Sequence, residues 1–325
     1  MTQKDIARQT GTSVATVSKA FSGSPEISEE TRQRIFDAAR RGGCYEKYYK
    51  GGYDARVVAV ICPEMESEYY TRIVSCLEKR ISAVGDVMTL SVSGFDAGKE
   101  KRLFEYHAYV QKADGVILLG GASAVVNRDH RPLVAIHAAG EISCADMMET
   151  DIRQGMRECV SWLKEAGHRE IGFVGDRFTA AKREAFREAM RELGLPVREE
   201  WTAESDLRFQ AAGYEEARRL LAGNRRPTAV IAAYDYIALG VIQYAHAAVI
   251  RVPEELSVIG MDNISLAPYL DIPLTTVDLH TEQMCDTVLE LLYKKMENPY
   301  YVACRSVTVR PDLMIRGSAG PAPGR

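Results

Sequence analysis

The apolar and polar positions at the start of the chain predict two short helices joined by a turn. The first spans residues 2–10 and opens with Thr2 and Asp5, a pair that can cap a helix N-terminus. A turn at Gly11 separates it from a second helix, residues 13–21, whose apolar stripe comprises Val17, Ala20 and Phe21. Two helices joined by a short turn that contains glycine are typical of the helix-turn-helix motif, although any small helical bundle has similar capped helices.

A third helix is predicted from Ser28 to about Arg41. Ser28 suits the N-cap, and the two acidic residues that follow it stabilise the first turn of a helix. The apolar residues expected in a core shared by the three helices are Ile27, Ile35, Phe36, Ala38 and Ala39. We interpret this helix as a scaffold for the first two.

From residue 57 onward, short apolar runs alternate with amphipathic segments. The runs, rich in Val and Ile, are residues 57–62, 87–92, 115–119, 132–136, 171–174, 228–233 and 256–260. The amphipathic segments predict helices at residues 69–84, 152–166, 180–193, 214–222 and 237–248. Continuous apolar strands that alternate with helices indicate an α/β fold with parallel sheets covered on both faces. Because these units are too many for one compact sheet, we expect two lobes, with a first passage between them at Met148–Arg153.

The composition is that of a globular protein with several domains. The chain has 325 residues, of which 46% are hydrophobic and 26% charged. It has no apolar run of membrane-spanning length and begins with a polar capped helix instead of a secretion leader, so we expect a cytoplasmic protein with no membrane partner. Its seven cysteines form no C-x-x-C pair and are expected to be reduced, mostly structural thiols.

The net charge of −4 does not favour a nucleic-acid partner, but the charge is divided unevenly along the chain. Residues 1–56 hold ten Lys and Arg against seven Asp and Glu, a balance of +3, so the remainder carries −7. The basic part is therefore the part that carries the helix-turn-helix pattern, as contact with phosphates requires. A surplus of this size also fits a solvated helical surface, so it supports the motif without replacing it.

The residue identities of this region resemble the headpiece of the LacI/GalR family of bacterial transcription regulators. The run DIARQTGTSVATVSK matches the family's D-[IV]-A-x-x-[AT]-G-x-S-x-x-T-V-S-[RK] core, and GSPEISEETR matches the motif that follows it. The resemblance implies that Val14, Ala15 and Lys19 read bases, with Lys19 in a slot that usually holds Arg. Hydroxyl residues at or near helix starts are expected to contact phosphates, namely Thr2, Ser13, Thr16, Ser18 and Ser28.

The following stretch departs from the family pattern. Members with a full hinge carry G-Y-x-P-N-x-x-A-x-x-L, a helix whose Leu enters the minor groove. Here the run from Gly43 to Val57 is about three residues shorter and lacks both the Pro-Asn pair and that Leu. We predict a flexible linker at residues 46–56, with Tyr48, Tyr49 or Tyr53 as an alternative aromatic wedge.

The remainder resembles the two-lobed, periplasmic-binding-protein-like core of the same family. The supporting runs are ICPEMESEYY, KADGVILL, EAGHREIGFVG, RPTAVIAAYDYIALG, VPEELSVIGMDN and PLTTVDLHTEQM. In such a core the chain crosses between lobes three times. The resulting domains are a headpiece at 1–45, a first lobe at 57–152 with about 279–303, a second lobe at 153–278 with about 304–317, and a disordered tail at 318–325.

Ligands of parallel α/β lobes bind at the carboxyl ends of the strands, which here means between the lobes. Polar and aromatic residues at such ends, several of them at positions that match the family's effector site, are Tyr69, Tyr70, His137, Lys182, Arg183, Tyr234, Asp235 and Asp262. Aromatic side chains with acids and a base suit a sugar, a nucleoside or a phosphorylated metabolite. The resemblance thus implies a repressor that binds double-stranded operator DNA as a homodimer, under the control of a small-molecule effector.

Other classes of function have less support. The sequence has no Walker P-loop, no G-x-S-x-G and no His or Cys cluster at metal spacing, so we expect no enzymatic activity, no cofactor and no metal. Paired acids such as Glu199 and Glu200 are explained by a solvated surface. The alternative that stays open is a family member that has altered or lost operator binding and acts as a cytoplasmic solute-binding protein.

Overall fold

The computed structural model describes all residues except 49–54, 122–124, 139–141, 143, 224, 299–302 and 325. It divides into two compact units, which we describe separately. One holds Met1–Arg56 with Gly85–Val87, and the other holds Val57–Val84 with Met88–Arg325. Most of the predicted linker at 46–56, with two of its three candidate tyrosines, lies outside the described residues.

The first unit contains the predicted helices. Because a short fourth helix extends the predicted headpiece of residues 1–45, we use the name headpiece for residues 1–48 from here on. Its helices are α1 (Gln3–Thr10), α2 (Val14–Phe21), α3 (Glu29–Arg41) and the short α4 (Tyr45–Tyr48). The N-caps of the first three helices are Thr2, Ser13 and Ser28, in that order. The side-chain hydroxyl of each accepts a hydrogen bond from a backbone N–H in the first turn of its helix. Gly11 ends α1 with a φ of 65°, the left-handed conformation that glycine adopts without strain.

The headpiece has its own apolar core. Ile6, Val17 and Ile35, one from each helix, have no exposed surface, and Phe21 packs against Phe36 with ring centroids 5.2 Å apart. The second helix is thereby held by one stripe, which leaves its other faces open to solvent. The predicted helix-turn-helix is confirmed.

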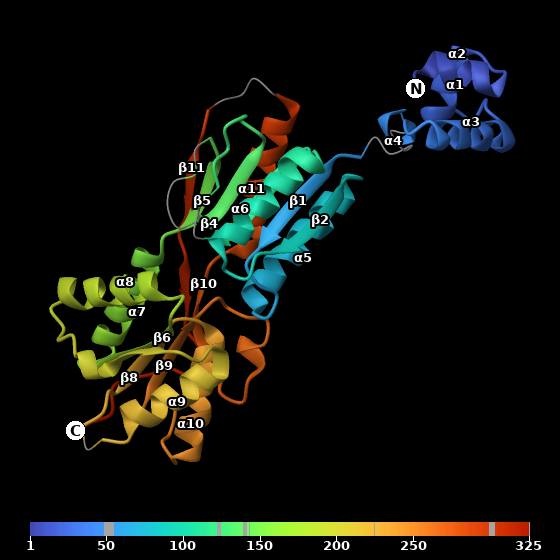
Figure 1. Cartoon of the computed structure of the whole chain (residues 1–325). Coiled ribbons are helices and arrows are strands. Elements are labelled where there is room, and N and C mark those ends of the chain that lie inside the picture. Colours follow the sequence, from blue (N-terminus) through green and yellow to red (C-terminus); the bar gives the residue numbers. More distant parts are fainter. Residues whose placement is uncertain are drawn as a thin grey trace. The chain divides into compact units, whose positions relative to one another are not determined.

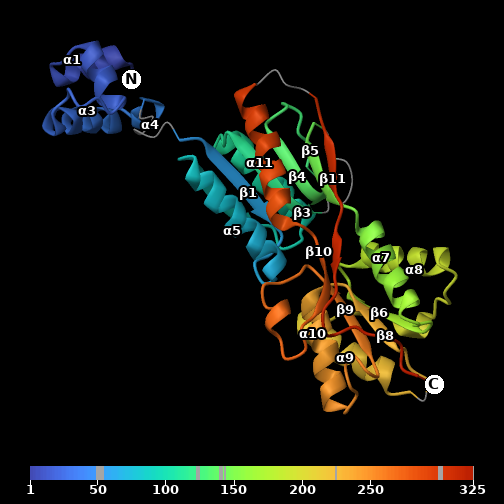
Figure 2. The same cartoon turned by 180° about the vertical axis from the view of Figure 1, so that it is seen from behind.

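The first lobe is built on a six-stranded sheet with the order β11-β5-β4-β3-β1-β2 (Figures 1 and 2). Its strands are β1 (Val57–Cys62), β2 (Val87–Val92), β3 (Gly115–Gly121), β4 (Leu133–Ala138), β5 (Asp146–Thr150) and β11 (Ser306–Val309). Strand β3 pairs in parallel with β1 and β4, and β5 pairs in parallel with β4 and β11. The helical elements of this lobe are α5 (Glu68–Ala83), α6 (Ala97–Glu105), the π-helix η1 (Tyr106–Val110) and α11 (Thr281–Glu297).

Alternation along β1 explains how both faces of this sheet are covered. Val58, Val60 and Cys62 belong to a cluster with residues of α5 and α11, whereas Ala59 and Ile61 belong to one with Phe104 of α6. Because successive side chains of a strand point to opposite faces, a run of five fully buried residues needs a helix layer on each side.

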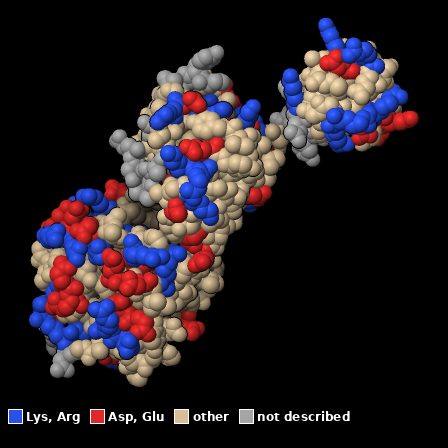
Figure 3. All heavy atoms as spheres, viewed as in Figure 1, with Lys and Arg blue, Asp and Glu red and all other residues tan. Residues whose placement is uncertain are grey.

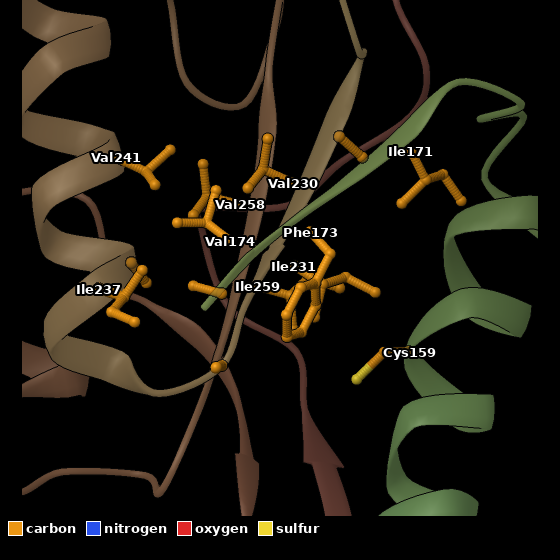
Figure 4. Close-up of a cluster of buried hydrophobic side chains, with 14 of the residues drawn as sticks. Cys159, Ile171, Phe173, Val174, Val230, Ile231, Ile237, Val241, Val258 and Ile259 are labelled. Atoms are coloured by element: carbon orange, nitrogen blue, oxygen red, sulfur yellow. The ribbon is translucent and has the colours of Figure 1, made fainter. Parts of the chain in front are cut away.

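The second lobe repeats this plan with the strand order β12-β10-β9-β8-β6-β7. Its strands are β6 (Ile171–Asp176), β7 (Thr202–Ser205), β8 (Ala229–Ala232), β9 (Ser257–Met261), β10 (Thr275–Asp278) and β12 (Asp312–Met314), of which only β12 is paired antiparallel among the described strands. Its helices are α7 (Ile152–Glu165), α8 (Ala180–Glu192), α9 (Phe209–Leu221) and α10 (Asp235–Ala247), with short 3-10 turns at Glu199–Trp201 and Ala267–Tyr269. Figure 4 shows Cys159 of α7 and Ile237 of α10 packing on opposite faces of the sheet.

The chain passes between the lobes three times, and the third passage lies later than the sequence suggested. The first two passages follow β5 and β10, close to the predicted positions. The third follows β11, which pairs with β5 of the first lobe through Ser306–Met147 to Val309–Thr150. Residues 306–309 therefore belong to the first lobe, although we had assigned 304–317 to the second.

The prediction of a disordered tail at 318–325 is wrong for the described residues 318–324. Ser318 has no exposed surface, and its backbone carbonyl accepts a 2.7 Å hydrogen bond from the Val258 N–H. Further along, the Gly320 carbonyl is 3.0 Å from His168 Nε2, and the Ala322 N–H donates to the Ala166 carbonyl. The small residues of this segment fit it against β9 and the end of α7, so composition alone was misleading.

Candidate functional sites

The second headpiece helix presents the residues that the sequence marked as base readers. Val14, Ala15, Ser18 and Lys19 are exposed and Thr16 is half-buried, whereas Val17 faces the core. The hydroxyl of Ser13 accepts a hydrogen bond from the Thr16 N–H at 3.0 Å and so fixes the start of this helix. An exposed, capped helix end of this kind can approach base edges in a major groove.

Lys19 has a partner that the sequence analysis did not anticipate. Its ammonium is ion-paired with the carboxylate of Glu26, seven residues further along, and both side chains are more than half exposed. An exposed pair of this type is weak, so a base or phosphate can compete for the lysine. The Glu26 carboxylate nevertheless places a negative charge beside the predicted reading position.

The predicted phosphate-contacting hydroxyls of Thr2 and Ser28 act first as helix caps. Thr2 Oγ1 lies 2.7 Å from Asp5 Oδ2, and Ser28 Oγ accepts from the Thr31 N–H at 3.3 Å. Both residues are exposed. Phosphate contacts in this region would therefore involve the N–H groups of the helix starts as well as these hydroxyls. Lys and Arg side chains lie around the rim of the headpiece in Figure 3.

The two lobes of the second unit enclose a cavity of about 410 Å³. Six of the eight predicted effector residues line it, namely Tyr69, Tyr70, His137, Lys182, Tyr234 and Asp262. They come from the carboxyl ends of strands or the helix starts that follow, which is where parallel sheets place ligands. The cavity therefore lies where the sequence predicted it.

The structure places Arg183 and Asp235 outside this cavity, which corrects their assignment. Arg183 is ion-paired with Glu204 on the neighbouring edge strand. Asp235 is fully buried, where its carboxylate accepts hydrogen bonds from the Ile264 N–H at 2.8 Å and from the Thr276 hydroxyl. Burial, opposed by these hydrogen bonds, raises the pKa of Asp235 well above its usual range. These partners indicate a structural role that joins the start of α10 to β10 and to the loop after β9.

Asp262 and Lys182 form a loose charged pair at the second-lobe wall of the cavity. Lys182 Nζ lies 3.8 Å from Asp262 Oδ1 and donates to the Ala233 carbonyl at 2.7 Å. Burial raises the pKa of Asp262 to about 6, and the ammonium of Lys182 opposes that shift only in part. Asp262 also has a φ of 107°, a conformation that side chains other than glycine rarely adopt. Strain of this kind is often found at binding sites.

Tyr69, His137 and Thr150 form a hydrogen-bonded chain on the first-lobe wall. The Tyr69 hydroxyl is 2.8 Å from His137 Nδ1, and the Thr150 hydroxyl is 2.9 Å from His137 Nε2. Burial, together with the nearby Lys182, lowers the pKa of His137 to about 4, so the imidazole is neutral at pH 7. A neutral imidazole has one donor and one acceptor, and both are used within this chain.

Arg208 was missed by the sequence analysis, and it lies at the centre of the cavity's second charged group. Its guanidinium is 3.7 Å from Asp176 Oδ2 in the same lobe and 3.8 Å from Glu64 Oε1 in the other lobe. It also stacks on Phe209, 4.3 Å from the ring centroid, and lies near Phe95 and Phe178. Because Arg208 follows a short, half-exposed edge strand instead of an apolar run, the pattern gave no signal for it.

Two further features bear on function. Among the described residues, no cluster of His, Cys, Asp or Glu is arranged to hold a metal ion. No helix in the described part of the chain combines the length and apolar character that crossing a membrane needs.

Comparison with known proteins places these sites in context. Residues 2–43 match the family described as bacterial regulatory proteins, lacI family, and residues 160–319 match the periplasmic binding protein-like domain. The HTH-type transcriptional regulator DegA of Bacillus subtilis is 27% identical over 98% of this chain and 97% of its own. The HTH-type transcriptional repressor CytR of Escherichia coli is 28% identical over 99% of this chain and 97% of its own.

Similarity to a solved structure extends over both units. A LacI-family transcriptional regulator from Silicibacter pomeroyi covers 98% of this chain and 99% of its own with a TM-score of 0.75, at 21% identity. The first match coincides with the headpiece, and the second covers most of the second lobe together with α11 and β11 of the first lobe. The described helix-turn-helix and the two-lobed core agree with this assignment. The chain therefore joins a DNA-binding domain of the lacI family of bacterial regulatory proteins to a periplasmic binding protein-like domain.

Proposed function

We propose that the chain is a transcriptional repressor that binds a two-fold symmetric operator as a homodimer. Its affinity for the operator changes when a small molecule binds in the cavity between its lobes. The observation that carries this proposal is the exposed face of α2 in a chain that also holds a polar, aromatic cavity elsewhere. The repressor function of the relative CytR supports it.

Sequence-specific reading is assigned to three side chains of α2. Lys19 can donate hydrogen bonds to guanine O6 or N7, and the small apolar Val14 and Ala15 can contact thymine methyl groups. Thr2, Ser13, Thr16, Ser18 and Ser28 would fix the helix against the phosphates. The alternative of lost operator binding has no support from the described headpiece, whose reading face is exposed and whose core is intact.

A homodimer is proposed because one headpiece makes too few base contacts for genomic specificity, and two linked half-sites combine their contributions. Exposed apolar side chains on the second lobe are candidates for contacts between two copies of the chain. Val249 is 85% and Tyr269 83% exposed, and Val249 also has a φ of 58°, which is strained for a β-branched residue.

Control by an effector follows from the position of the cavity between two lobes. Contacts such as the 3.1 Å hydrogen bond from Arg72 of α5 to the Asn263 carbonyl hold the lobes together. An effector that binds one lobe arrangement more tightly shifts the population toward it, and through a dimer the shift changes DNA affinity.

The test is selection of duplexes from a random library by the full-length chain, followed by sequencing. The proposal expects enrichment of two half-sites related by two-fold symmetry, and Lys19→Ala should abolish enrichment at one base position of each half-site. Binding of all duplexes with equal affinity at low salt would contradict the proposal.

For the cavity, Asp262→Ala should keep DNA binding but lose any change in DNA affinity caused by the small-molecule pool of the source cell.

A further inference from the structure

The cavity between the lobes holds more carboxylates than cations. Glu64, Glu149 and Asp262 line it, against Lys182 and Arg208. The neutral imidazole of His137 adds no charge. Asp176, fully buried behind Tyr234 and Arg208, brings a fourth carboxylate close to this group. A ligand that enters this cavity therefore meets an excess of negative charge.

Both cations are already engaged by the protein. Lys182 is shared between Asp262 and the Ala233 carbonyl. Arg208 lies between Glu64 and Asp176, with one face of its guanidinium stacked on Phe209. An acidic or phosphorylated ligand would have to displace these pairs, and it would add negative charge beside the carboxylates that remain. This charge arrangement disfavours the phosphorylated metabolite that the sequence left open.

The lining carboxylates Glu64 and Glu149, in contrast, can accept further hydrogen bonds. The Glu64 side chain is only 9% exposed, and its Oε1 atom is buried without a hydrogen-bond donor, while its Oε2 atom accepts from the Ser67 N–H at 3.1 Å. Glu149 lines the first-lobe wall and has no hydrogen-bond or ion-pair partner among the described residues. A buried acceptor without a donor is costly, so Glu64 Oε1 favours a ligand that donates. Glu149 is half-buried, and a ligand can reach its carboxylate without displacing a protein donor.

Aromatic rings complete the lining. Tyr69 and Tyr70 lie beside the carboxylates, and Phe95 and Phe178 stack across the two lobes with ring centroids 4.2 Å apart. The faces of such rings attract cations, and Arg208 already shows that a cation is accepted among them. Hydroxyl donors of a neutral sugar would satisfy the acceptors, but only a cation would also balance the charge.

We infer that the effector carries a protonated amine, as an amino sugar or another small hydroxylated amine does, and that its ammonium binds to the Glu149 carboxylate in the cavity that Glu64 and Asp262 also line. This inference rests on the proposed effector function of the cavity. Glu149 is the determinant of charge specificity, because it is the lining carboxylate without a counter-ion among the described residues. The remaining hydroxyls of the ligand would contact the polar groups of both walls.

The first test compares matched pairs of probes on the full-length chain by thermal unfolding and calorimetry. The pairs are D-glucosamine with D-glucose, and putrescine with 1,4-butanediol. We expect an amine to bind about tenfold or more tightly than its neutral counterpart, and Glu149→Gln to remove that difference. Glu105→Gln, which changes an exposed glutamate of the same lobe outside the cavity, should leave it unchanged.

The second test identifies what the protein retains without any choice of probe. The chain is incubated with the small-molecule pool of its source cell, washed and unfolded, and the released molecule is weighed before and after reaction with dansyl chloride. A mass gain on dansylation, with reduced retention by Glu149→Gln, supports the inference. A retained molecule without an amine, or neutral probes that bind as tightly as their amines, overturns it. If nothing binds in either test, the effector function itself fails, while DNA binding is unaffected.

Discussion

Lys19 is the basic side chain of α2, and its ammonium has to exchange Glu26 for a base. We predict that Lys19→Ala weakens binding to the selected operator by about 1–3 kcal/mol, the value of one base-reading contact, and leaves binding to scrambled duplex nearly unchanged. Fluorescence anisotropy with both duplexes at several salt concentrations measures the two affinities. Equal losses on both duplexes would mean that Lys19 contacts phosphate only.

The matched control for that experiment is Glu26→Gln. Removing this carboxylate frees Lys19 and takes a negative charge away from the DNA-facing surface, so affinity for operator and for scrambled duplex should both rise. If affinity for scrambled duplex rises while operator affinity does not, then Glu26 orients Lys19 for the operator as well as neutralising it.

His137 and Asp262 make the free energy of unfolding depend on pH in opposite directions. The pKa of His137 is lowered to about 4, so its contribution to stability is lost as the pH falls from 6.5 to 4. The pKa of Asp262 is raised to about 6, so its contribution is present below its ordinary pKa and is lost as the pH rises toward 6. Each corresponds to roughly 3 kcal/mol across its window. The two effects largely cancel between pH 4 and 6.

Variants at these two positions should separate the two contributions to stability. Compared with wild type, Asp262→Asn should lose more stability on acidification from pH 6 to 4, because the stabilising protonation of Asp262 is absent. His137→Gln should lose less stability over the same range, because the destabilising protonation of His137 is absent. Urea unfolding of the chain at several pH values provides the comparison, and parallel pH profiles for both variants would contradict the assignment of these pKa shifts.

At the residue level, prediction succeeded where position in an element decides the role. Asp262 and Tyr234 could be selected because each ends an apolar strand. Arg183 could not be distinguished from Lys182, since neighbouring residues of a helix point about 100° apart and only coordinates show which one faces the cavity. Arg208 is held by Glu64, from a segment far away in the sequence, so no local pattern indicates it.

Elements were predicted well where periodicity is strong and poorly where the segment is short. The buried strands of both lobes and the capped headpiece helices follow directly from apolar runs and N-cap residues. The strand β11 has alternating half-exposed residues at the sheet edge, and only its pairing with β5 reveals the lobe to which it belongs. The last residues have the composition of a disordered segment, yet backbone hydrogen bonds attach them to the second lobe.

The C-terminal segment should therefore contribute to stability. Ser318 Oγ accepts a hydrogen bond from the Thr275 N–H at 2.8 Å and donates to the Val258 carbonyl at 2.6 Å, with no exposed surface. We predict that Ser318→Ala lowers the free energy of unfolding by about 1–3 kcal/mol, because a buried N–H loses its acceptor. Chemical denaturation measures this change.

Ser161→Ala is the control for this prediction. The Ser161 hydroxyl bonds only to Glu165 on the exposed side of a helix, so its loss should change stability by a few tenths of a kcal/mol at most. Equal, small effects of both substitutions would show that the tail is not bound to the lobe in solution.

For the whole molecule, the sequence predicted the parts and their order but could not predict what holds the lobes together. The described contacts between lobes are scattered in sequence, and they include Arg72 with Asn263, the Ser265 N–H with Glu68, Arg208 with Glu64, and Phe95 with Phe178. The Phe95–Phe178 stack is the one among these that depends on no charge, and Phe178 remains 41% exposed. Such contacts are weak enough for ligand binding to change the balance between open and closed lobes.

We predict that Phe178→Ala shifts this balance toward the open arrangement. Loss of one aromatic pair costs about 0.5–1.5 kcal/mol, which changes the ratio of closed to open forms by roughly threefold to tenfold. The radius of gyration measured by small-angle X-ray scattering should increase without effector, and effector affinity should fall by at least that factor, because Phe178 also lines the cavity. Tyr106→Ala, at an exposed aromatic residue of the first lobe away from the cavity, should change neither quantity.

The same variant also tests the link between cavity and DNA. If lobe closure controls the headpieces, thermodynamic reciprocity requires that a variant with fewer closed molecules has an altered operator affinity even without effector. The direction of that change identifies the effector as inducer or corepressor, because effector binding and Phe178→Ala move the lobes in opposite senses. An unchanged operator affinity, in a variant whose scattering and effector affinity have both shifted, would mean that the signal to the headpiece does not pass through lobe closure.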